Sequence, residues 1–293
     1  MRNTLLLMLG LGACGGGGSS DPVDAAPDGL DTSSFKTLIK SDWSLQPNTE
    51  IYQCATVTVM HDMYIAELRP AIPLGTHHTV LSIGPVRGPD NAGYVCSDPF
   101  EFGGRFIYGT GVGSKPFLYP DGIALKLTAG QQVHINLHLY NTSDEVLSGT
   151  SGVEVREIEK STVQHEARVE ITGTNTLNIP PGVSTQTGTC TALSEINVLS
   201  FQPHMHQLGT HLTYTVTPAA GSPYMLYDQD YTFDGQEHVM FDPVRTLHSG
   251  DQLKIDCTYN NTTGNTVTFG ESSNDEMCLA GITLYPYNAN FCQ

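Results

Sequence analysis

Two histidines one residue apart are the first sign of chemistry in this sequence. They lie in residues 202–209 (QPHMHQLG), within a stretch whose composition otherwise favours β-structure. Because side chains two positions apart on a strand point to the same side, His204 and His206 could hold one metal ion between them. Two surface histidines at this spacing would need no metal, so other parts of the chain must distinguish the two interpretations.

A second candidate pair, His77 and His78, is adjacent in the segment LGTHHTVL. Neighbouring residues on a regular strand face opposite sides. Both could therefore bind one metal only if the chain bends there, through a bulge or at a strand end. Pro73 and Gly75 lie just upstream and are compatible with such a bend.

Two further histidines could supply a third ligand to that pair. His134 and His138 lie four residues apart in QVHINLHLY, an alternating pattern that places both on one face of a strand. Either could complete a three-histidine site, and the local sequence does not choose between them. His134 could instead lie beside the metal ligands and orient one of them.

Met277, in the segment SSNDEMC, indicates which metal to expect. A lone methionine is ordinarily a core residue, but with His204 and His206 it could complete a site of two nitrogens and one thioether sulfur. Thioether is a soft ligand that favours Cu(I), whereas imidazole serves both oxidation states of copper. If Met277 is a ligand, the sequence predicts a copper ion that changes redox state.

The elements that position these residues are predicted to be strands. Alternating apolar and polar residues recur along the chain, and turn clusters separate them. With 30 Gly, 17 Pro and few helix-like apolar periods, the chain is predicted to be all-β, as a sandwich or a barrel. One short helix is expected over residues 34–40. The clearest alternating segments are residues 51–60, 132–140, 211–217, 252–259 and 280–285.

The length of 293 residues suggests one large domain or two of roughly 140 residues. The best candidate boundary lies near residues 159–164, after an alternating block and before the next one. We therefore predict an N-terminal domain over residues 34–160 and a C-terminal domain over residues 161–293.

The first thirteen residues are predicted to be an export signal. Residues 1–3 are a short basic start, and residues 4–11 form an apolar run too short to span a membrane as a helix. The next residues, LGAC, resemble a bacterial lipoprotein cleavage box, which implies lipid attachment to Cys14. Residues 14–33 would then form a flexible, Gly-rich linker. The alternative is an ordinary signal peptide that contains a cysteine.

The net charge excludes some classes of partner, and the number of cysteines indicates the compartment. The formal net charge of −17 argues against nucleic acid or anionic lipid as a partner. Six cysteines remain besides Cys14, and an even number in an exported chain predicts three disulfides. No CxxC spacing occurs, so a zinc–thiolate site is not expected. The chain is predicted to lie in a bacterial cell envelope, held at a membrane surface only by its lipid.

The order of these motifs resembles a known family. Two adjacent histidines, a later strand histidine, His-x-His and Glu-Met-Cys follow one another as in the copper type II, ascorbate-dependent monooxygenases. The resemblance covers roughly residues 45–293 in the same order. The other segments of this chain that resemble the family are residues 136–141 (NLHLYN), 151–153 (SGV), 179–182 (IPPG), 250–260 and 284–292.

The resemblance implies two tandem jelly-roll-like β-sandwich domains with one copper ion each. The N-terminal domain would hold the electron-transfer copper, and the C-terminal domain the copper that activates oxygen. Ascorbate or a similar reductant would supply the electrons. The implied ligands are His77, His78 and His138 in the N-terminal domain and His204, His206 and Met277 in the C-terminal domain.

The implied reaction is hydroxylation of a C–H bond of a small substrate with O₂. Thr79 follows the histidine pair where the family most often has a methionine that is not a ligand. Gln202 stands where a peptide-amidating member has an arginine that pairs with the substrate carboxylate, and Gly281 where it has a tyrosine. A substrate without a recognised carboxylate is therefore expected.

The resemblance also implies how the six cysteines pair. One pair would close the second domain end to end, and another would brace the residue next to Met277. Removal of a native disulfide from a secreted domain typically costs about 2–5 kcal/mol. The implied pairs are Cys54–Cys96, Cys190–Cys292 and Cys257–Cys278.

Two other functions would need no catalysis. The same fold could bind copper as a sensor or scavenger, or an adhesive all-β module could carry its histidines incidentally. Two coppers with ascorbate-dependent oxygen uptake would favour the monooxygenase. Copper without uptake would favour a binding protein, and no copper would favour the structural module.

Overall fold

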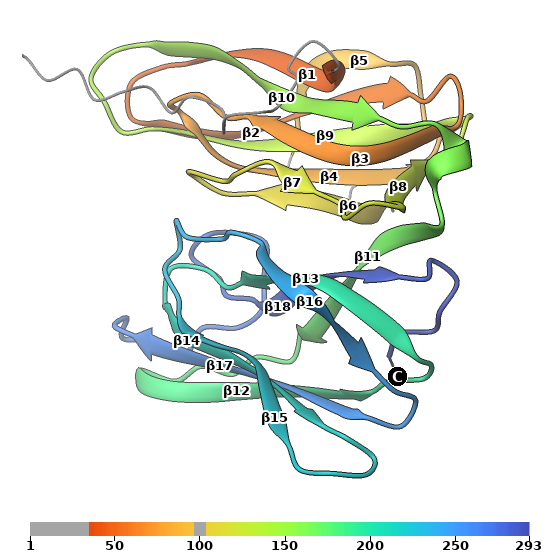
Figure 1. Cartoon of the computed structure of the whole chain (residues 1–293). Coiled ribbons are helices and arrows are strands. Elements are labelled where there is room, and N and C mark those ends of the chain that lie inside the picture. The colour runs from red at the N-terminus through yellow and green to blue at the C-terminus, as the bar shows by residue number, and fades with distance from the viewer. Residues whose placement is uncertain (1–34, 97–103, 293) are drawn as a thin grey trace, which may run out of the picture. The chain divides into compact units, whose positions relative to one another are not determined.

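The computed structural model describes residues 35–96 and 104–292 (Figure 1). These residues form strands almost throughout, and their one helical element is a single 3₁₀ turn, η2 (Lys160–Thr162). The prediction of an all-β fold with sandwich-like sheets is confirmed. No helix within these ranges has the length and apolar character needed to cross a membrane. The predicted signal peptide, Cys14 and the linker lie outside the described residues.

A nine-stranded sheet runs through both halves of the chain, and it is continuous because β8 and β11 pair in parallel. Its strands follow the order β1 (Phe35–Leu45), β10 (Leu147–Glu157), β3 (Met63–Ala71), β8 (Ile123–Leu127), β11 (His165–Thr174), β18 (Cys278–Tyr285), β13 (Ile196–His204) and β16 (Val239–Leu247), with β7 (Phe117–Leu118) paired to β3.

Two smaller sheets complete the fold, one in each half of the chain. The five-stranded sheet has the order β5 (Asn91–Val95), β2 (Thr49–Thr58), β9 (Gln131–Asn141), β4 (Thr76–Pro85) and β6 (Arg105–Thr110). The four-stranded sheet has the order β12 (Gly182–Thr191), β17 (Gln252–Asn261), β14 (Gly209–Thr217) and β15 (Tyr224–Asp230).

Two hydrophobic cores are buried by these sheets. The first draws on residues 39–167 together with Leu199, and it takes side chains from both the long sheet and the five-stranded sheet. The second draws on residues 177–291 and combines the long sheet with the four-stranded sheet. Residues 34–293 form one compact unit, so the predicted domain boundary at residue 160 stays a prediction.

The short helix expected over residues 34–40 is wrong. From Phe35 onward the chain is β1, which pairs antiparallel with β10. Every second residue from Ile39 to Leu45 is buried, which is the period of a strand and not of a helix. Trp43 anchors this strand, because its ring is buried and its Nε1–H donates to Ser151 Oγ at 2.7 Å. Tertiary pairing therefore decides the conformation of this segment.

Four of the five alternating segments that the sequence singles out lie wholly in strands, and the fifth, residues 51–60, lies in a strand as far as Thr58. β14 and β17 bury every second residue, as the alternation predicts, whereas β9 and β18 are buried on both faces over most of their length. The five segments correspond to β2, β9, β14, β17 and β18.

Three disulfides brace the fold, and they are the pairs that the resemblance implies. Disulfides persist in oxidising compartments, so the three bonds indicate an exported protein. The bonded pairs are Cys54–Cys96, Cys190–Cys292 and Cys257–Cys278.

Candidate metal centres

Three histidines come together on two neighbouring strands, β4 and β9. His77 and His78 belong to β4, and His138 lies opposite His78 on β9. The ligand atoms of all three lie within 4.8 Å of one another. Nδ1 of His78 is 3.1 Å from Nδ1 of His77 and 3.3 Å from Nδ1 of His138. These residues, predicted to bind the first copper, are therefore adjacent in space.

A bulge in β4 allows two adjacent histidines to approach the same point. The register against β9 shifts between Thr76 and His78, which places the irregularity at His77. Just before it, Gly75 has φ +100°, and a Cβ there would lie 2.7 Å from the ring of Trp43. Only glycine fits that backbone conformation and that space. The bend expected from the His-His spacing is present.

Carboxylates on the outer side of the rings determine which nitrogens face inward. Nε2 of His138 is 2.5 Å from Oε1 of Glu50, and Nε2 of His77 is 3.1 Å from Oδ1 of Asp234. A neutral ring that donates its Nε2–H keeps an unprotonated Nδ1. His77 and His138 therefore both direct lone pairs at His78, which can donate at most one Nδ1–H. One of the two Nδ1···Nδ1 contacts of His78 therefore has no hydrogen between its nitrogens.

Protonation of His78 would not remove this mismatch, because its Nδ1 carries at most one hydrogen in either state, and the charged ring is itself unfavourable here. Burial lowers its pKa well below the usual value, and the neighbouring His138 and His77 lower it further. Burial also lowers the pKa of His138, against the opposing effect of Glu50. Neutral imidazoles with converging lone pairs suit a bound cation, and copper is among the metals that imidazole binds well. The donor set therefore fits a copper ion.

His134, the alternative third ligand, lies outside this cluster. It is four residues before His138 on β9, opposite Thr56 on β2 and Ser82 on β4. A strand rises about 3.3 Å per residue, which separates the two backbone positions by about 13 Å. The His134 side chain is buried, and burial lowers its pKa. A role beside the metal ligands stays a prediction.

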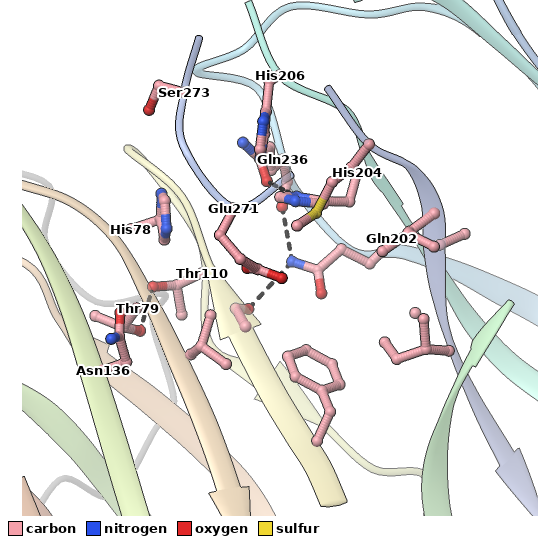
Figure 2. Close-up of a pocket in the computed structure, with 18 of the residues that line it drawn as sticks. His78, Thr79, Thr110, Asn136, Gln202, His204, His206, Gln236, Glu271 and Ser273 are labelled. Atoms are coloured by element: carbon pink, nitrogen blue, oxygen red, sulfur yellow. Dashed lines mark hydrogen bonds between the residues drawn. The ribbon is translucent and has the colours of Figure 1, made fainter. Parts of the chain in front are cut away.

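The second predicted donor set lines one cavity. His204, His206 and Met277 all contribute to its wall, and Figure 2 shows both histidines there. The two imidazole rings have centroids 5.3 Å apart and are nearly perpendicular, at 89°. His204 ends β13, and Met277 immediately precedes β18, which pairs with β13.

The strand expected to carry both histidines ends at His204. At Met205 and His206 the backbone N–H groups bond to side chains and not to a neighbouring strand. The Met205 N–H donates to Tyr231 Oη at 3.1 Å, and Tyr231 Oη–H donates to the Met205 carbonyl at 2.5 Å. The His206 N–H donates to Glu276 Oε2 at 2.9 Å. Strand alternation is thus the wrong explanation for how the rings meet, because these side chains position the second one.

The hydrogen bonds of His204 and His206 leave the same ring nitrogen, Nε2, unprotonated in both. Nδ1–H of His204 donates to Gln236 Oε1 at 2.7 Å, and Nδ1–H of His206 donates to the Asp275 carbonyl at 3.1 Å. Each ring therefore keeps a lone pair on Nε2. Burial lowers the pKa of both, that of His206 to about 4. Two neutral imidazoles and a thioether on one cavity are a donor set that fits copper.

Glu276 ties the methionine to the histidine pair. Its buried carboxylate accepts the backbone N–H groups of His206 at 2.9 Å, Leu208 at 2.7 Å and Met277 at 3.3 Å. Tyr259 Oη–H donates to the Met277 carbonyl at 2.7 Å. Burial raises the pKa of Glu276, and the three N–H groups partly offset that rise. Sequence reasoning missed this anchor, although it adjoins Met277 in the Glu-Met-Cys motif.

Four other groups that orient the histidines had no local sequence signal. Each lies far along the chain from the ring it contacts, or belongs to a segment without a motif. They are Glu50, Asp234, Gln236 and the Asp275 carbonyl.

One cavity of about 280 Å³ adjoins both donor sets. His78 of the first cluster lines it together with His204 and His206 of the second (Figure 2). Phe233 also links the two sets, because its ring centroid is 4.5 Å from that of His77 and 6.1 Å from that of His206. A small molecule bound in this cavity would therefore contact residues of both candidate centres.

Comparison with known proteins relates the chain to copper enzymes. Residues 166–293 match the family described as copper type II ascorbate-dependent monooxygenase, C-terminal domain. DBH-like monooxygenase protein 1 of Homo sapiens is 27% identical over 85% of this chain and 46% of its own length. The Gallus gallus protein of that name is 28% identical, over 61% and 33%. Dopamine beta-hydroxylase of Homo sapiens is 28% identical, over 60% and 31%. The chain spans less than half the length of these relatives.

Proposed function

Because residues 166–293 belong to the copper type II ascorbate-dependent monooxygenase family, we propose that this chain is a copper- and ascorbate-dependent monooxygenase that hydroxylates a C–H bond of a small substrate. One observation carries the proposal. Two donor sets, one of three imidazoles and one of two imidazoles with a thioether, adjoin the same cavity. The family relationship alone would support copper chemistry, but it would not indicate where a substrate binds.

In this proposal each half of the chain holds one copper ion. When bound, copper supplies one-electron transfer and dioxygen activation, so that with ascorbate as reductant one oxygen atom enters the substrate and the other leaves as water. The proposed ligands are Nδ1 of His77, His78 and His138 for one ion, and Nε2 of His204, Nε2 of His206 and the sulfur of Met277 for the other.

The chain's own groups would hold the imidazoles in the orientation that metal binding needs. Glu50 and Asp234 accept the outer N–H groups of the first set. Gln236 and the Asp275 carbonyl do the same for the second. Partners of this kind fix the tautomer and raise the basicity of a ligating histidine. Both donor sets would thus be arranged before the metal arrives.

Metal content and oxygen uptake test the proposal. After dialysis of the purified chain against mixed copper and zinc, we expect two coppers per chain and no tightly bound zinc. Ascorbate-dependent oxygen uptake should then rise with a substrate from a panel of small molecules. Two coppers without uptake across the panel would favour a non-catalytic copper-binding protein on the same fold. One copper, or zinc in preference, would reject the two-site proposal.

We further propose that the exported chain is held at a membrane surface through lipid on Cys14. The three disulfides support export, and the LGAC segment supports lipid attachment. The proposed partners are a small substrate, O₂ and a reductant, with no nucleic acid.

A further inference from the structure

We propose that His238 is a positioning residue for the second candidate metal centre. It fastens the segment that carries Gln236 to strand β6, and Gln236 fixes the tautomer in which His204 presents its lone pair. This inference rests on the proposed function, because it names a residue that serves the same site. His238 lies directly before β16 and belongs to neither donor set.

A hydrogen bond joins His238 to the first half of the chain. Its Nε2–H donates to the Gly109 carbonyl of β6 at 3.2 Å, although 129 residues separate the two in the sequence. Burial lowers the pKa of His238 to about 4, so near neutral pH the ring is uncharged and carries one hydrogen. Its Nδ1 is buried and has no hydrogen-bond partner among the described residues. A hydrogen on Nδ1 would be a buried donor without an acceptor, which is unfavourable, so the hydrogen belongs on Nε2.

Two aromatic side chains of the first core hold the His238 ring in this orientation. The ring stacks on Tyr108 of β6, with 5.6 Å between centroids and 5° between planes, and it meets Phe117 of β7 edge-on at 4.9 Å and 69°. Tyr108 and Phe117 are both buried. Their positions are therefore set by the first core, and His238 takes its own position from them.

The backbone just before His238 packs closely against the end of β6. Gly111 directly follows this strand, and a Cβ on it would lie 3.3 Å from the Asp234 carbonyl oxygen and 3.4 Å from Cβ of Gln236. Both distances are short for non-bonded atoms. The backbone that carries Gln236 therefore lies directly on β6, with the His238 hydrogen bond two residues further along the chain.

Gln202 links this contact to a metal ligand. Its Nε2 donates to the Gly109 carbonyl at 3.2 Å and to the Gln236 carbonyl at 2.9 Å (Figure 2). The Gln236 side chain is buried, and its own Nε2 donates to the Phe233 carbonyl at 2.8 Å. That bond leaves Oε1 of Gln236 to accept Nδ1–H of His204 at 2.7 Å. One carbonyl of β6 thus anchors a network that ends on a proposed copper ligand.

Loss of the His238 N–H should therefore release the tautomer of His204. The segment would lose one of the two side chains that bind the Gly109 carbonyl. Gln236 could then turn away from His204, and the ring could carry its hydrogen on Nε2. That nitrogen would no longer offer a lone pair, so metal affinity at the second centre would fall.

Nuclear magnetic resonance of the metal-free full chain, labelled at its histidine ring nitrogens, tests this inference. Proton–nitrogen correlation spectra near neutral pH report which ring nitrogen carries the hydrogen, and His204→Gln and His238→Gln assign the two rings. In the wild type we expect the hydrogen of His204 on Nδ1 and that of His238 on Nε2. A hydrogen on Nδ1 of His238 would overturn the proposal without any further variant.

Two substitutions separate the hydrogen bond from packing. His238→Phe keeps a ring and deletes the N–H, whereas His238→Gln keeps an N–H and deletes the ring. In His238→Phe the ratio of the two His204 tautomers should shift about 2- to 10-fold toward the Nε2–H form, the effect of one net hydrogen bond. Copper affinity at the second centre, measured by competition with a chelator, should fall by a similar factor. His238→Gln should keep the wild-type values.

His211→Phe is the matched control, because His211 contacts Asp228 and Asp230 and neither donor set. It should leave the His204 tautomer and both copper affinities unchanged. An unchanged tautomer in His238→Phe would overturn the proposal, and so would an equal shift in His238→Gln. If His238→Phe does not fold, the wild-type tautomers and His238→Gln still decide.

The tautomer is measured without metal, so the outcome does not depend on the proposed function. A His204 tautomer that responds to His238→Phe in a chain that binds no copper would reject the proposed enzyme and still support the positioning role. Ascorbate-dependent oxygen uptake in a chain whose His204 tautomer ignores His238→Phe would support the enzyme and overturn this inference.

Discussion

Oδ1 of Asp234 lies 3.1 Å from Nε2 of His77, although 157 residues separate them in the sequence. His77 belongs to the three-histidine cluster. Asp234 is next to Phe233, whose ring contacts both histidine sets, and two residues before Gln236, which binds His204. The short segment 233–236 therefore contacts both candidate metal centres.

This contact predicts that Asp234→Ala weakens copper binding at the first centre. The His77 ring would lose the acceptor that holds its Nε2–H, and loss of such a partner typically costs 10- to 100-fold in metal affinity. The Asp234 side chain is 77% exposed, so the free energy of unfolding should change by no more than about 0.5 kcal/mol. Competition with a copper chelator, followed by electron paramagnetic resonance of Cu(II), measures the effect.

Asp228→Ala is the matched control, because Asp228 contacts His211, which belongs to neither donor set. It should leave both copper affinities unchanged. An equal loss of affinity in the two variants would show that the Asp234 contact does not position His77.

Met277→Ile should affect the second centre alone. The change keeps apolar bulk and deletes the sulfur, so Cu(I) loses its soft ligand while His204 and His206 remain. We expect a copper content between one and two per chain and a large fall in substrate hydroxylation. The first copper should still be reduced by ascorbate. An apolar swap of similar volume usually costs less than about 1.5 kcal/mol of stability.

X-ray absorption of the reduced protein provides the direct readout for this variant. The wild type should show a sulfur scatterer, and the Met277→Ile variant should show none. Nitrogen ligands alone in the wild type would make Met277 a core residue and remove the thioether from the proposed site.

The metal-free protein should lose stability as the pH falls from about 6.5 toward 4. The pKa of His206 is lowered from 6.5 to about 4, chiefly by burial, so in this window the unfolded chain binds more protons than the folded one. Stability must then rise with pH. For His206 alone the change between pH 6.5 and 5 is about 2 kcal/mol.

Denaturant titrations of the metal-free protein at several pH values measure this dependence. Glu276 acts in the opposite direction, because its pKa is raised, so His206→Gln is the comparison that isolates the histidine. The variant should show a shallower pH dependence than the wild type. Equal slopes would mean that His206 already titrates at its ordinary pKa.

Cys14→Ser should release the chain from membranes without changing its fold. The mutated residue precedes the compact unit of residues 34–293, so its lipid should act only as an anchor. Partitioning into detergent compares the two proteins, and thermal unfolding checks that stability is preserved. Equal partitioning would argue against lipid on Cys14.

Residue types and their alternation were enough to predict the kinds of donor and the kind of secondary structure. Imidazole and thioether are properties of residues, and alternation with period two reports burial of one strand face. The spacing of His77 and His78 predicted a bend, and a bulge is found there. Resemblance to a family, and not spacing, supplied the disulfide pairs and the choice of His138 over His134.

Contacts between distant groups could be found only in the folded chain. β1 is a strand and not a helix because it pairs with β10 and buries Trp43. Asp234 reaches His77, and Glu276 holds the chain after His204, through contacts between segments that share no local pattern. Sequence spacing specifies which side of one element a residue faces. Which elements then face each other depends on long-range strand pairing and on burial of the two cores, and these are properties of the whole folded chain.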